Sequence, residues 1–463
     1  MPSFTTPPPP TERKYFGTDG IRGLANAGAM TPEMAMRIGA AVTYRASQSR
    51  SHAPRVVIGK DTRLSGYLFE SAISAGVCAM GGRVMLSGPL PTPAIAHLTT
   101  SMRADVGVVI SASHNAYQDN GIKLFGADGF KLPDAEELAL EALIDGDVLD
   151  RARPTRLDVG RAGRLDDAPG RYVAYVKATF PAERTLDGVR IVVDAAHGAA
   201  YRVAPLVFAE LGADVFTIGT SPDGRNINAR VGALHPEACA REVKKRKAHL
   251  GIALDGDADR LIVVDEKGQT VDGDALMALC ALQLLRKRKL KKRTLVTTVM
   301  SNLGLERAIT AAGGKVLRCA VGDRYVVEAL RKKGLNLGGE QSGHLVFLDH
   351  ATTGDGLVGA LQLLALLGET ERPLSELARE VMTRVPQVLK SEVFEARMPL
   401  EQMGKTGAEV EKTRQRLGDE GRVVIRWSGT EPKLRVMLEG PKSKVIDAMA
   451  DRILAAARKD LGA

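Results

Sequence analysis

The stretch "LGIALDGDADRLIVVD", residues 250–265, places a short polar segment between two apolar runs. The apolar runs are rich in Leu, Ile and Val, which is typical of strands that are buried on both faces of a sheet. Carboxylates stand at every second position of the polar segment, at Asp255, Asp257 and Asp259. Because alternate side chains of an extended chain point the same way, we expect these carboxylates to converge at the end of a buried strand.

The unit around this stretch recurs along the chain. Three β-rich runs, 55–61, 189–198 and 294–302, are each followed by a helical stretch, a Gly-containing turn, a second strand and a third apolar run. The third runs are "ADVGVVISAS" (104–113), "AHLGIALDGD" (248–257) and "KGLNLGGEQS" (333–342), and each ends in a polar or Gly-rich loop. The repeat predicts α/β architecture: three tandem α/β/α domains of shared topology with mostly parallel sheets. Ligands bind outside the carboxyl ends of such strands, so we expect the three loops to face one cleft.

The C-terminal residues do not follow this repeat. The segment "GRVVIRWSGTEPKLRVMLEG" (421–440) predicts two strands around a polar turn, and "SKVIDAMADRILAAARKDL" (443–461) predicts an amphipathic helix. We therefore expect a separate α+β domain. The expected domains are 13–165, 166–265, 266–385 and 386–463, after a Pro-rich extension, residues 1–12, that we expect to be disordered.

Composition narrows the class of protein. The chain has 463 residues, 44% of them hydrophobic and 26% charged, as expected of a globular protein with several domains. It has no run of about 18 apolar residues and no secretory signal, so we expect a cytoplasmic protein without membrane contact. Two basic runs, 241–247 and 286–293, contribute much of the net charge of +9. Neither run contains an aromatic residue and each closes a helical stretch, so we interpret both as solvated faces and not as nucleic-acid sites.

The three aspartates predict a metal site. Convergent carboxylates repel one another unless a cation holds them, and such oxygen ligands suit Mg²⁺ that also contacts a phosphate. An EF-hand loop is excluded, although Glu266 falls at its twelfth position, because Arg260 stands where that loop needs Gly and strands flank the segment. A polar turn that only joins two strands is the remaining alternative.

Ser113 ends the corresponding run of the first repeat, within "ISASHNAYQDNGIK" (110–123). A hydrolase is disfavoured because G-x-S-x-G is absent and His114, as the next residue, need not reach the serine hydroxyl. An exposed serine at a strand end, a Mg²⁺-type triplet and a phosphate pocket together fit phosphoryl transfer. The pocket is expected in "RWSGTEPKLR" (426–435), where guanidinium forks, hydroxyls and a glycine suit a phosphate: Arg426, Ser428, Gly429, Thr430 and Arg435.

Two further segments carry candidate binding residues. In "LGGEQSGHL" (337–345), Glu340 and Ser342 are spaced to grip adjacent sugar hydroxyls, whereas His344 taken alone is more often a packed histidine. Arg22 and Arg63 stand in Gly-bounded turns, where each suits either a phosphate or the fixing of a loop. For Arg63 we favour the structural interpretation.

With these motifs in order, the chain resembles the α-D-phosphohexomutase superfamily over nearly its whole length. The motifs are "YFGTDGIRG", "SASHN…DNGIK", "DGDADR", "GGEQSGH" and "RWSGTEP". The fourth motif, with Gln341, resembles the form of this loop in the branch of the superfamily that acts on glucosamine phosphates. The resemblance implies four domains around a central cleft, the last of them built on an antiparallel sheet.

The resemblance also implies a reaction. Ser113 is expected to be a phosphoserine that, with Asp255, Asp257 and Asp259, holds one Mg²⁺ per chain. It would donate its phosphoryl group to glucosamine 6-phosphate and take back the 6-phosphoryl group of the glucosamine 1,6-bisphosphate intermediate, leaving glucosamine 1-phosphate for UDP-N-acetylglucosamine synthesis. Glucosamine 1,6-bisphosphate or an equivalent phosphoryl donor would charge the serine, and relatives suggest a homodimer.

The implied site residues follow from the matched motifs. Lys123 and Arg22 are candidates for proton transfer or charge stabilisation beside the phosphoserine, and His114 is a weaker one. The implied substrate-binding residues are Glu340, Ser342, His344, Arg260, Arg426, Ser428, Gly429, Thr430 and Arg435. Two alternatives stay open: the same chemistry on mannose or glucose phosphates, and a non-catalytic sugar-phosphate sensor or nucleic-acid binder on the same fold.

Overall fold

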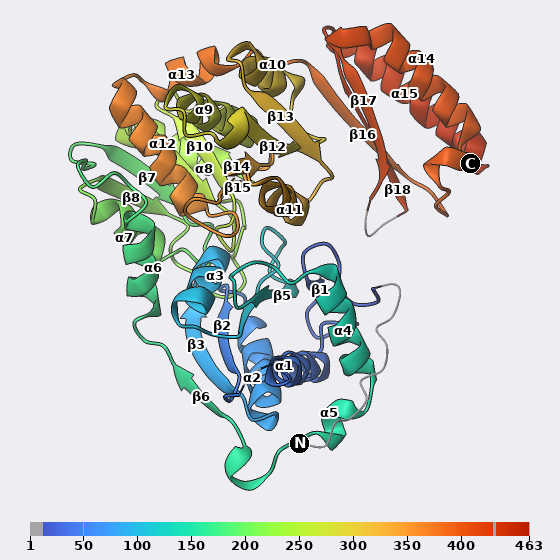
Figure 1. The fold of residues 1–463 in the computed structure, drawn as a ribbon. Coiled ribbons are helices and arrows are strands. Elements are labelled where there is room, and N and C mark those ends of the chain that lie inside the picture. The colour runs from blue at the N-terminus through green and yellow to red at the C-terminus, as the bar shows by residue number, and fades with distance from the viewer. Residues whose placement is uncertain (1–12, 50, 429–431, 463) are drawn as a thin grey trace.

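The computed structural model describes residues 13–49, 51–428 and 432–462 (Figure 1). The Pro-rich extension, residues 1–12, and two expected phosphate-binding residues, Gly429 and Thr430, lie outside the described residues. The three repeats form three sheets flanked by helices, and the C-terminal segment forms a fourth sheet. The predicted fold class is thus confirmed, while the domain boundaries stay predictions.

The first sheet has the strand order β1-β5-β4-β2-β3-β6. Its strands are β1 (Ile21–Leu24), β2 (Arg55–Lys60), β3 (Arg83–Pro89), β4 (Val106–Ile110), β5 (Asp119–Gly126) and β6 (Arg161–Arg164). The accompanying helices are α1 (Pro32–Ser47), α2 (Gly66–Ala79), α3 (Thr92–Ser101), α4 (Asp134–Asp145) and α5 (Val148–Arg151). Because side chains alternate along β2, Val56 and Ile58 belong to the core beneath α1 and α2, whereas Val57 belongs to the core beneath α3.

The second and third sheets have the orders β11-β10-β9-β7-β8 and β13-β12-β14-β15. Elements of the second are α6 (Ala168–Lys177), β7 (Arg190–Asp194), α7 (Val203–Ala209), β8 (Asp214–Ile218), α8 (Pro236–Arg246), β9 (Leu250–Leu254), β10 (Leu261–Asp265) and β11 (Thr270–Val271). Elements of the third are α9 (Gly273–Arg286), β12 (Thr294–Thr298), α10 (Leu303–Ala311), β13 (Lys315–Cys319), α11 (Asp323–Lys333), β14 (Leu337–Gly339), β15 (Leu345–Phe347), α12 (Gly356–Thr370) and α13 (Leu374–Val381).

The repeat is visible in the pairing of these strands. In each sheet the first strand of the unit lies between the second and third strands and is parallel to both, as in β8-β7-β9. The strand that follows the third one returns antiparallel to it, as β10 does beside β9. The sheets are therefore mixed: most pairings are parallel, as expected, but one side of each sheet is antiparallel, which the sequence did not predict. The reason is that each polar loop is the turn of a hairpin, which the apolar runs alone did not reveal.

The fourth sheet has the order β16-β18-β17 and is antiparallel throughout. It contains β16 (Gln387–Val393), β17 (Arg422–Trp427) and β18 (Lys433–Glu439), with α14 (Gly404–Leu417) and α15 (Ser443–Leu461) packed on it. The two predicted strands and the amphipathic helix are confirmed. Arg422 ties this sheet to the third domain, because its Nη1 donates to the Val299 carbonyl at 2.9 Å.

The first three domains share one continuous apolar core. A single cluster of buried side chains extends from Val57 in the first domain through Ile252 in the second to Leu361 in the third. A separate cluster fills the C-terminal domain between its sheet and α14 and α15. The polar loops of the first three domains are thus carried on one packed body. Among the described residues, none of the helices has both the length and the apolar character that crossing a bilayer requires.

Candidate active site

The three predicted loops follow equivalent strands. Ser113 follows β4, Asp255 follows β9 and Glu340 follows β14, and each of these strands is buried along its whole length. Since the three strands occupy the same place in the repeat, the loops leave the sheets at their carboxyl ends, where ligands bind in α/β proteins. Side chains of all three loops meet there, because Ser113 contacts Asp255 and His344 of the third loop lies close to Asp259.

Ser113 directly contacts the turn between β9 and β10 of the second domain, residues 255–260, which carries the three aspartates and is called the metal loop. The Ser113 hydroxyl donates to Asp255 Oδ2 at 2.6 Å, and His114 Nδ1 lies 3.3 Å from the Ser113 hydroxyl oxygen. The Ser113 backbone has a φ of 51°, in the left-handed region that few residues other than Gly adopt. We expected an exposed serine, but Ser113 is 1% exposed. The expectation was wrong because the second-domain loop, over 140 residues away in sequence, closes over the strand end.

Arg63 fixes the loop between β4 and β5, residues 111–118, which contains Ser113 and is called the serine loop. It is fully buried, and its guanidinium donates to the Asp61 carboxylate and to the backbone carbonyls of Ser113, Asn115, Ala116 and Asp119. A planar fork with five N–H groups is suited to such a set of acceptors. The interpretation of Arg63 as a loop-fixing residue therefore agrees with the structure.

Asn228, a residue that the sequence analysis did not single out, supports the same loop from the second domain. Its side-chain amide donates to the carbonyls of Ser113 and Asn115 at 2.9 and 3.0 Å. Arg63 of the first domain and Asn228 of the second domain thus both donate hydrogen bonds to the backbone at Ser113. No local pattern identifies Asn228, because its acceptors lie more than 110 residues away in the sequence.

The three aspartates converge, as predicted, but for a different reason. Oxygens of Asp255, Asp257 and Asp259 lie within 4.8 Å of one another and all three residues are buried. The segment is a tight turn and not an extended strand: the Ala258 N–H donates to the Asp255 carbonyl at 3.0 Å, and Ala258 has a φ of 57°. Burial and the neighbouring charges of Asp259 and Asp257 raise the pKa of Asp255 to about 8.

These carboxylates fit a divalent cation. Oδ1 of Asp257 and Oδ1 of Asp259 are buried and accept no hydrogen bond from any described residue. Buried carboxylate oxygens without donors are costly unless a charge compensates them. Hard oxygen ligands of this kind suit Mg²⁺. The donor set therefore supports the predicted metal site, with Asp255, Asp257 and Asp259 as the protein ligands beside the Ser113 hydroxyl.

Lys123 lies on the other side of the carboxylates. It is 1% exposed, and its Nζ lies 2.8 Å from Asp257 Oδ2, 3.4 Å from Asp259 Oδ2 and 3.3 Å from Asp19 Oδ2. Burial alone would lower its pKa, but the three carboxylates raise the pKa of Lys123 well above its ordinary value. Lys123 is thus a fixed positive charge at this site. Thr92 adds a hydroxyl that donates to Asp257 Oδ2 at 2.6 Å.

A chain of ion pairs links Lys123 to the third domain. Asp19 pairs with Lys123, Arg22 and Lys131, and Lys131 also pairs with Asp323 at the start of α11. Burial opposes the ionisation of Asp19, but its three cationic partners hold the pKa of that carboxyl well below its usual range. Arg22 belongs to this network through Asp19, and its role as a site residue stays a prediction.

Asp19, Lys131 and Asp323 were not predicted from the sequence, although the motif "YFGTDGIRG" contains the first of them. The presence of a carboxylate beside Arg22 in that motif was the one available signal. Lys131 and Asp323 lie 192 residues apart, and only the packing of the first domain against the third brings them together.

The two histidines occupy different environments. Burial, together with Arg260 and Arg22, lowers the pKa of His114 to about 4, so its ring is neutral at pH 7. His344 is 2% exposed, with Nδ1 3.7 Å from Asp259 Oδ1 and Nε2 3.8 Å from Asp323 Oδ2. Burial would lower the pKa of His344, but Asp259 and Asp323 raise it. The structure places His344 behind the metal loop, so its expected contact with substrate stays a prediction.

The remaining sugar-loop candidates line the same region. Glu340 accepts a hydrogen bond from the Gly322 N–H at 3.1 Å, and burial raises its pKa. Arg260 donates its backbone N–H to Asp255 Oδ1 at 3.2 Å, while its Nε is buried without a partner among the described residues. Ser342 is exposed. The sugar loop, residues 340–344, thus offers the carboxylate of Glu340 and the hydroxyl of Ser342 to a ligand, and the turn that carries the three aspartates adds the guanidinium of Arg260.

The C-terminal sheet places two arginines face to face. Arg426 on β17 is directly opposite Arg435 on β18, and Arg435 Nη2 lies 3.5 Å from the hydroxyl of Ser428. Like charges opposite each other on a sheet are destabilising unless an anion lies between them. Burial and Arg435 lower the pKa of Arg426, whereas Glu340 raises it, so this pair lies within electrostatic reach of the sugar loop. Arg426 Nε has no partner among the described residues.

Comparison with known proteins agrees with this geometry. Residues 13–149, 170–268 and 272–385 match the phosphoglucomutase/phosphomannomutase alpha/beta/alpha domains I, II and III, and residues 380–456 match the C-terminal domain of that family. The chain belongs to the phosphohexomutase superfamily. The serine loop, metal loop, sugar loop and arginine pair therefore lie on four successive phosphohexomutase domains.

Relatives in the superfamily cover nearly the whole chain. A phosphoglucosamine mutase of Sorangium cellulosum is 64% identical over 97% of this chain and 94% of that protein. One from Pelobacter propionicus is 58% identical over 97% of this chain and 99% of that protein. A phosphoglucomutase/phosphomannomutase family protein from Burkholderia thailandensis, 24% identical, has the same fold, with a TM-score of 0.80 over 96% of this chain and 97% of that one.

Proposed function

We propose that this phosphohexomutase is a phosphoglucosamine mutase, an isomerase that interconverts glucosamine 6-phosphate and glucosamine 1-phosphate. Relatives that carry this name are 55–64% identical to the chain and extend over nearly all of it. The product would supply UDP-N-acetylglucosamine synthesis for the cell envelope. The cytoplasmic location and the homodimer remain predictions.

The proposed carrier of the phosphoryl group is Ser113. In the forward direction the O1 hydroxyl oxygen of the sugar attacks phosphorus, the bond between phosphorus and Ser113 Oγ breaks, and the O1 proton is released. After the bisphosphate turns end over end, Ser113 Oγ attacks the 6-phosphoryl group, the bond between phosphorus and the sugar O6 breaks, and O6 takes up a proton in place of the one released from O1. Two geometrically distinct phosphate positions are then required, and the Arg426–Arg435 pair provides the one away from the serine.

Charge neutralisation is the main task of the residues around Ser113. Lys123, kept protonated by the carboxylates around it, faces the serine loop as a fixed cation and is better suited to stabilising charge than to accepting a proton. Arg22 adds a second cation from β1. A Mg²⁺ held by Asp255, Asp257 and Asp259 would neutralise the charge on the transferring phosphoryl group.

One observation carries this proposal: the Ser113 hydroxyl lies 2.6 Å from Asp255 Oδ2, so the carrier serine and the metal loop already form one site across two domains. Peptide mass spectrometry before and after incubation with glucosamine 1,6-bisphosphate and Mg²⁺ tests it. We expect one added phosphate on Ser113, and loss of both the phosphate and mutase turnover in Ser113→Ala. Ser71→Ala, an exposed serine on α2, is the control and should retain both. Full turnover in Ser113→Ala would refute the proposal.

The sugar preference is tested separately. Specificity constants for the 6-phosphates of glucosamine, glucose and mannose should rank glucosamine first. A preference for mannose or glucose phosphate with the same serine chemistry would favour the alternative phosphomannomutase/phosphoglucomutase activity. If the protein neither binds a sugar phosphate nor turns one over, a binding protein of another class is favoured.

A further inference from the structure

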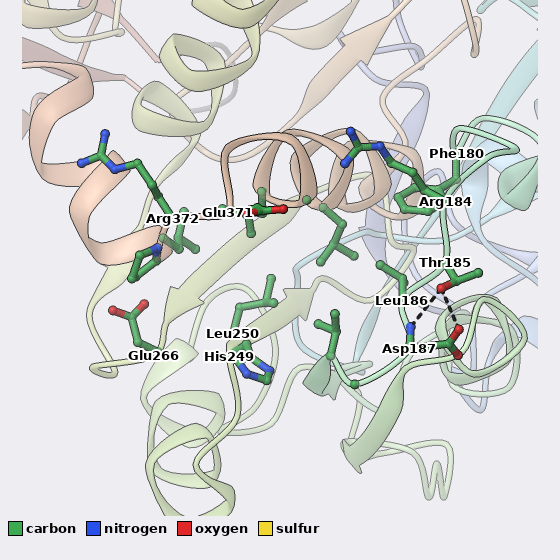
Figure 2. A pocket seen from close by; sticks show the side chains of 17 residues that line it. Phe180, Arg184, Thr185, Leu186, Asp187, His249, Leu250, Glu266, Glu371 and Arg372 are labelled. Carbon is green, nitrogen blue, oxygen red and sulfur yellow. Dashed lines mark hydrogen bonds between the residues drawn. The ribbon is translucent and has the colours of Figure 1, made fainter.

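A cavity lies at the start of strand β9, the end opposite to the one that leads into the three aspartates. It has a volume of about 580 Å³ and lies where the second domain meets helices α12 and α13 of the third (Figure 2). Its walls are the connection 180–189 before β7, the start of β9, Glu266 after β10, and residues 364–374. A volume of this size falls within the range of pockets that hold small molecules.

The interior of this cavity is apolar. Leu186, Leu250, Leu364 and Leu374 line it and are each at most 3% exposed, and Leu367 is a half-buried apolar residue of the same wall. Charged side chains stand at the margin, with Arg184 beside Phe180 at one end and Arg372 and Glu266 at the other (Figure 2). The walls therefore offer apolar contacts to the body of a ligand.

Most of the charged groups at the margin already have partners. Arg372 pairs with Glu376 and Glu380, Glu266 accepts from the Ser375 hydroxyl, and Asp187 accepts from the Thr185 hydroxyl.

Arg184 differs from these groups. It is half-buried, and its guanidinium has no hydrogen-bond or ion-pair partner among the described residues. Glu371, by contrast, is exposed at the C-terminal cap of α12, where solvent compensates its charge. The charge that the cavity offers to a ligand is thus a single positive one.

Two rigid elements connect this cavity to the metal loop. Strand β9 begins at Leu250 in the cavity wall and leads directly into Asp255, a distance of about 16 Å for a five-residue strand. Helix α12, 15 residues and so about 22 Å long, lines the cavity with Leu364 and Leu367. At its other end the Gly356 N–H donates to the Ala258 carbonyl at 3.0 Å, within the turn that carries the three aspartates. A displacement of either element by a ligand would reach the metal loop.

We propose that this cavity is an effector site that binds a small amphipathic anion, with an apolar body against the leucines and one anionic group on Arg184, and that its occupancy changes the metal loop through β9 and α12. The ligand class follows from the apolar lining and the uncommitted guanidinium. The site goes beyond the mutase activity and does not depend on it.

Fluorescence titration of the full-length protein with 8-anilinonaphthalene-1-sulfonate tests the binding. N-phenyl-1-naphthylamine, which has the same apolar body without the anion, is the matched neutral probe. We expect one sulfonate probe per chain, affinity about tenfold lower in Arg184→Gln, as for loss of one charge-assisted hydrogen bond, and unchanged affinity for the neutral probe. Leu367→Trp, which places an indole ring across the apolar wall of the cavity, should block binding of both probes.

Arg416→Gln, an exposed arginine on α14 in the C-terminal domain, is the control and should bind both probes as the wild type does. Equal affinity of Arg184→Gln and wild type for the sulfonate probe, or several probes per chain, would overturn the site.

Coupling is measured by amide hydrogen exchange with the sulfonate probe at saturation. We expect altered exchange in residues 255–260 of the wild type and no change there in Leu367→Trp. Exchange that changes at 180–189 and 364–374 but not at 255–260 would overturn the effector role. Because neither readout uses the mutase reaction, failure of this proposal is distinguishable from failure of the proposed function.

Discussion

Replacing Arg63 by Lys is predicted to release the serine loop while retaining the charge. The guanidinium donates five side-chain hydrogen bonds, one to Asp61 and four to carbonyls between Ser113 and Asp119. An ammonium group has three protons, so at least two of the five are lost. Asn228 continues to serve the carbonyls of Ser113 and Asn115, so the loss falls first on the later part of the loop.

The expected cost follows from these numbers. A buried carbonyl that loses its donor costs about 1 to 3 kcal/mol, so two of them lower the free energy of local opening by about 2 to 6 kcal/mol. The lower value corresponds to exchange of the loop amides about 30-fold faster than in the wild type. Displacement of Ser113 by about 1 Å is expected to lower kcat about a hundredfold, because phosphoryl transfer depends on positioning.

Two measurements check this prediction. Hydrogen exchange of residues 111–121 reports the opening of the loop, and turnover of glucosamine 6-phosphate reports the position of the serine. Arg416→Lys makes the same exchange of side chains on the surface of α14 and should change neither. Wild-type exchange rates together with wild-type kcat in Arg63→Lys would show that the four carbonyl contacts do not position Ser113.

Three further predictions concern the turn with the three aspartates, the arginine pair of the C-terminal sheet, and the junction of the first and third domains. Asp255 has a pKa of about 8 in the metal-free protein, so its carboxyl group is protonated at pH 7. Mg²⁺ binding should therefore release close to one proton. The apparent affinity for Mg²⁺ should rise from pH 6 to 8 and level off above pH 8. Calorimetry in buffers of different ionisation enthalpy checks this, and binding without proton release contradicts it. Arg426→Gln should raise KM for the sugar phosphate about tenfold to a hundredfold with a smaller change in kcat, and steady-state kinetics showing an unchanged KM would remove Arg426 from the phosphate pocket. Arg324→Met should destabilise the junction of the first and third domains by about 3 kcal/mol, because it leaves the buried Glu137 with Arg13 as its remaining cation; an unchanged melting temperature would argue against it.

Much of the fold followed from local patterns. The apolar runs, the turns and the helical periodicity repeat three times, so the three α/β domains and the C-terminal α+β domain were predicted correctly. The hairpin that follows each polar loop was not, because an apolar run does not reveal the direction in which its partner strand returns. The same limit applies to the metal loop, where convergence was predicted from an extended chain and is achieved by a turn at Ala258.

By itself, the sequence determined which residue types stand at each strand end, and hence the class of chemistry: a serine, three aspartates, a sugar loop and an arginine pair. Tertiary structure alone decided which of them meet. It buried Ser113 against Asp255, placed His344 behind Asp259, and brought Asp19, Lys131 and Asp323 together. The physical reason is that spacing along a chain governs which side chains share a strand or helix face. Contacts between separate domains depend on how those domains pack.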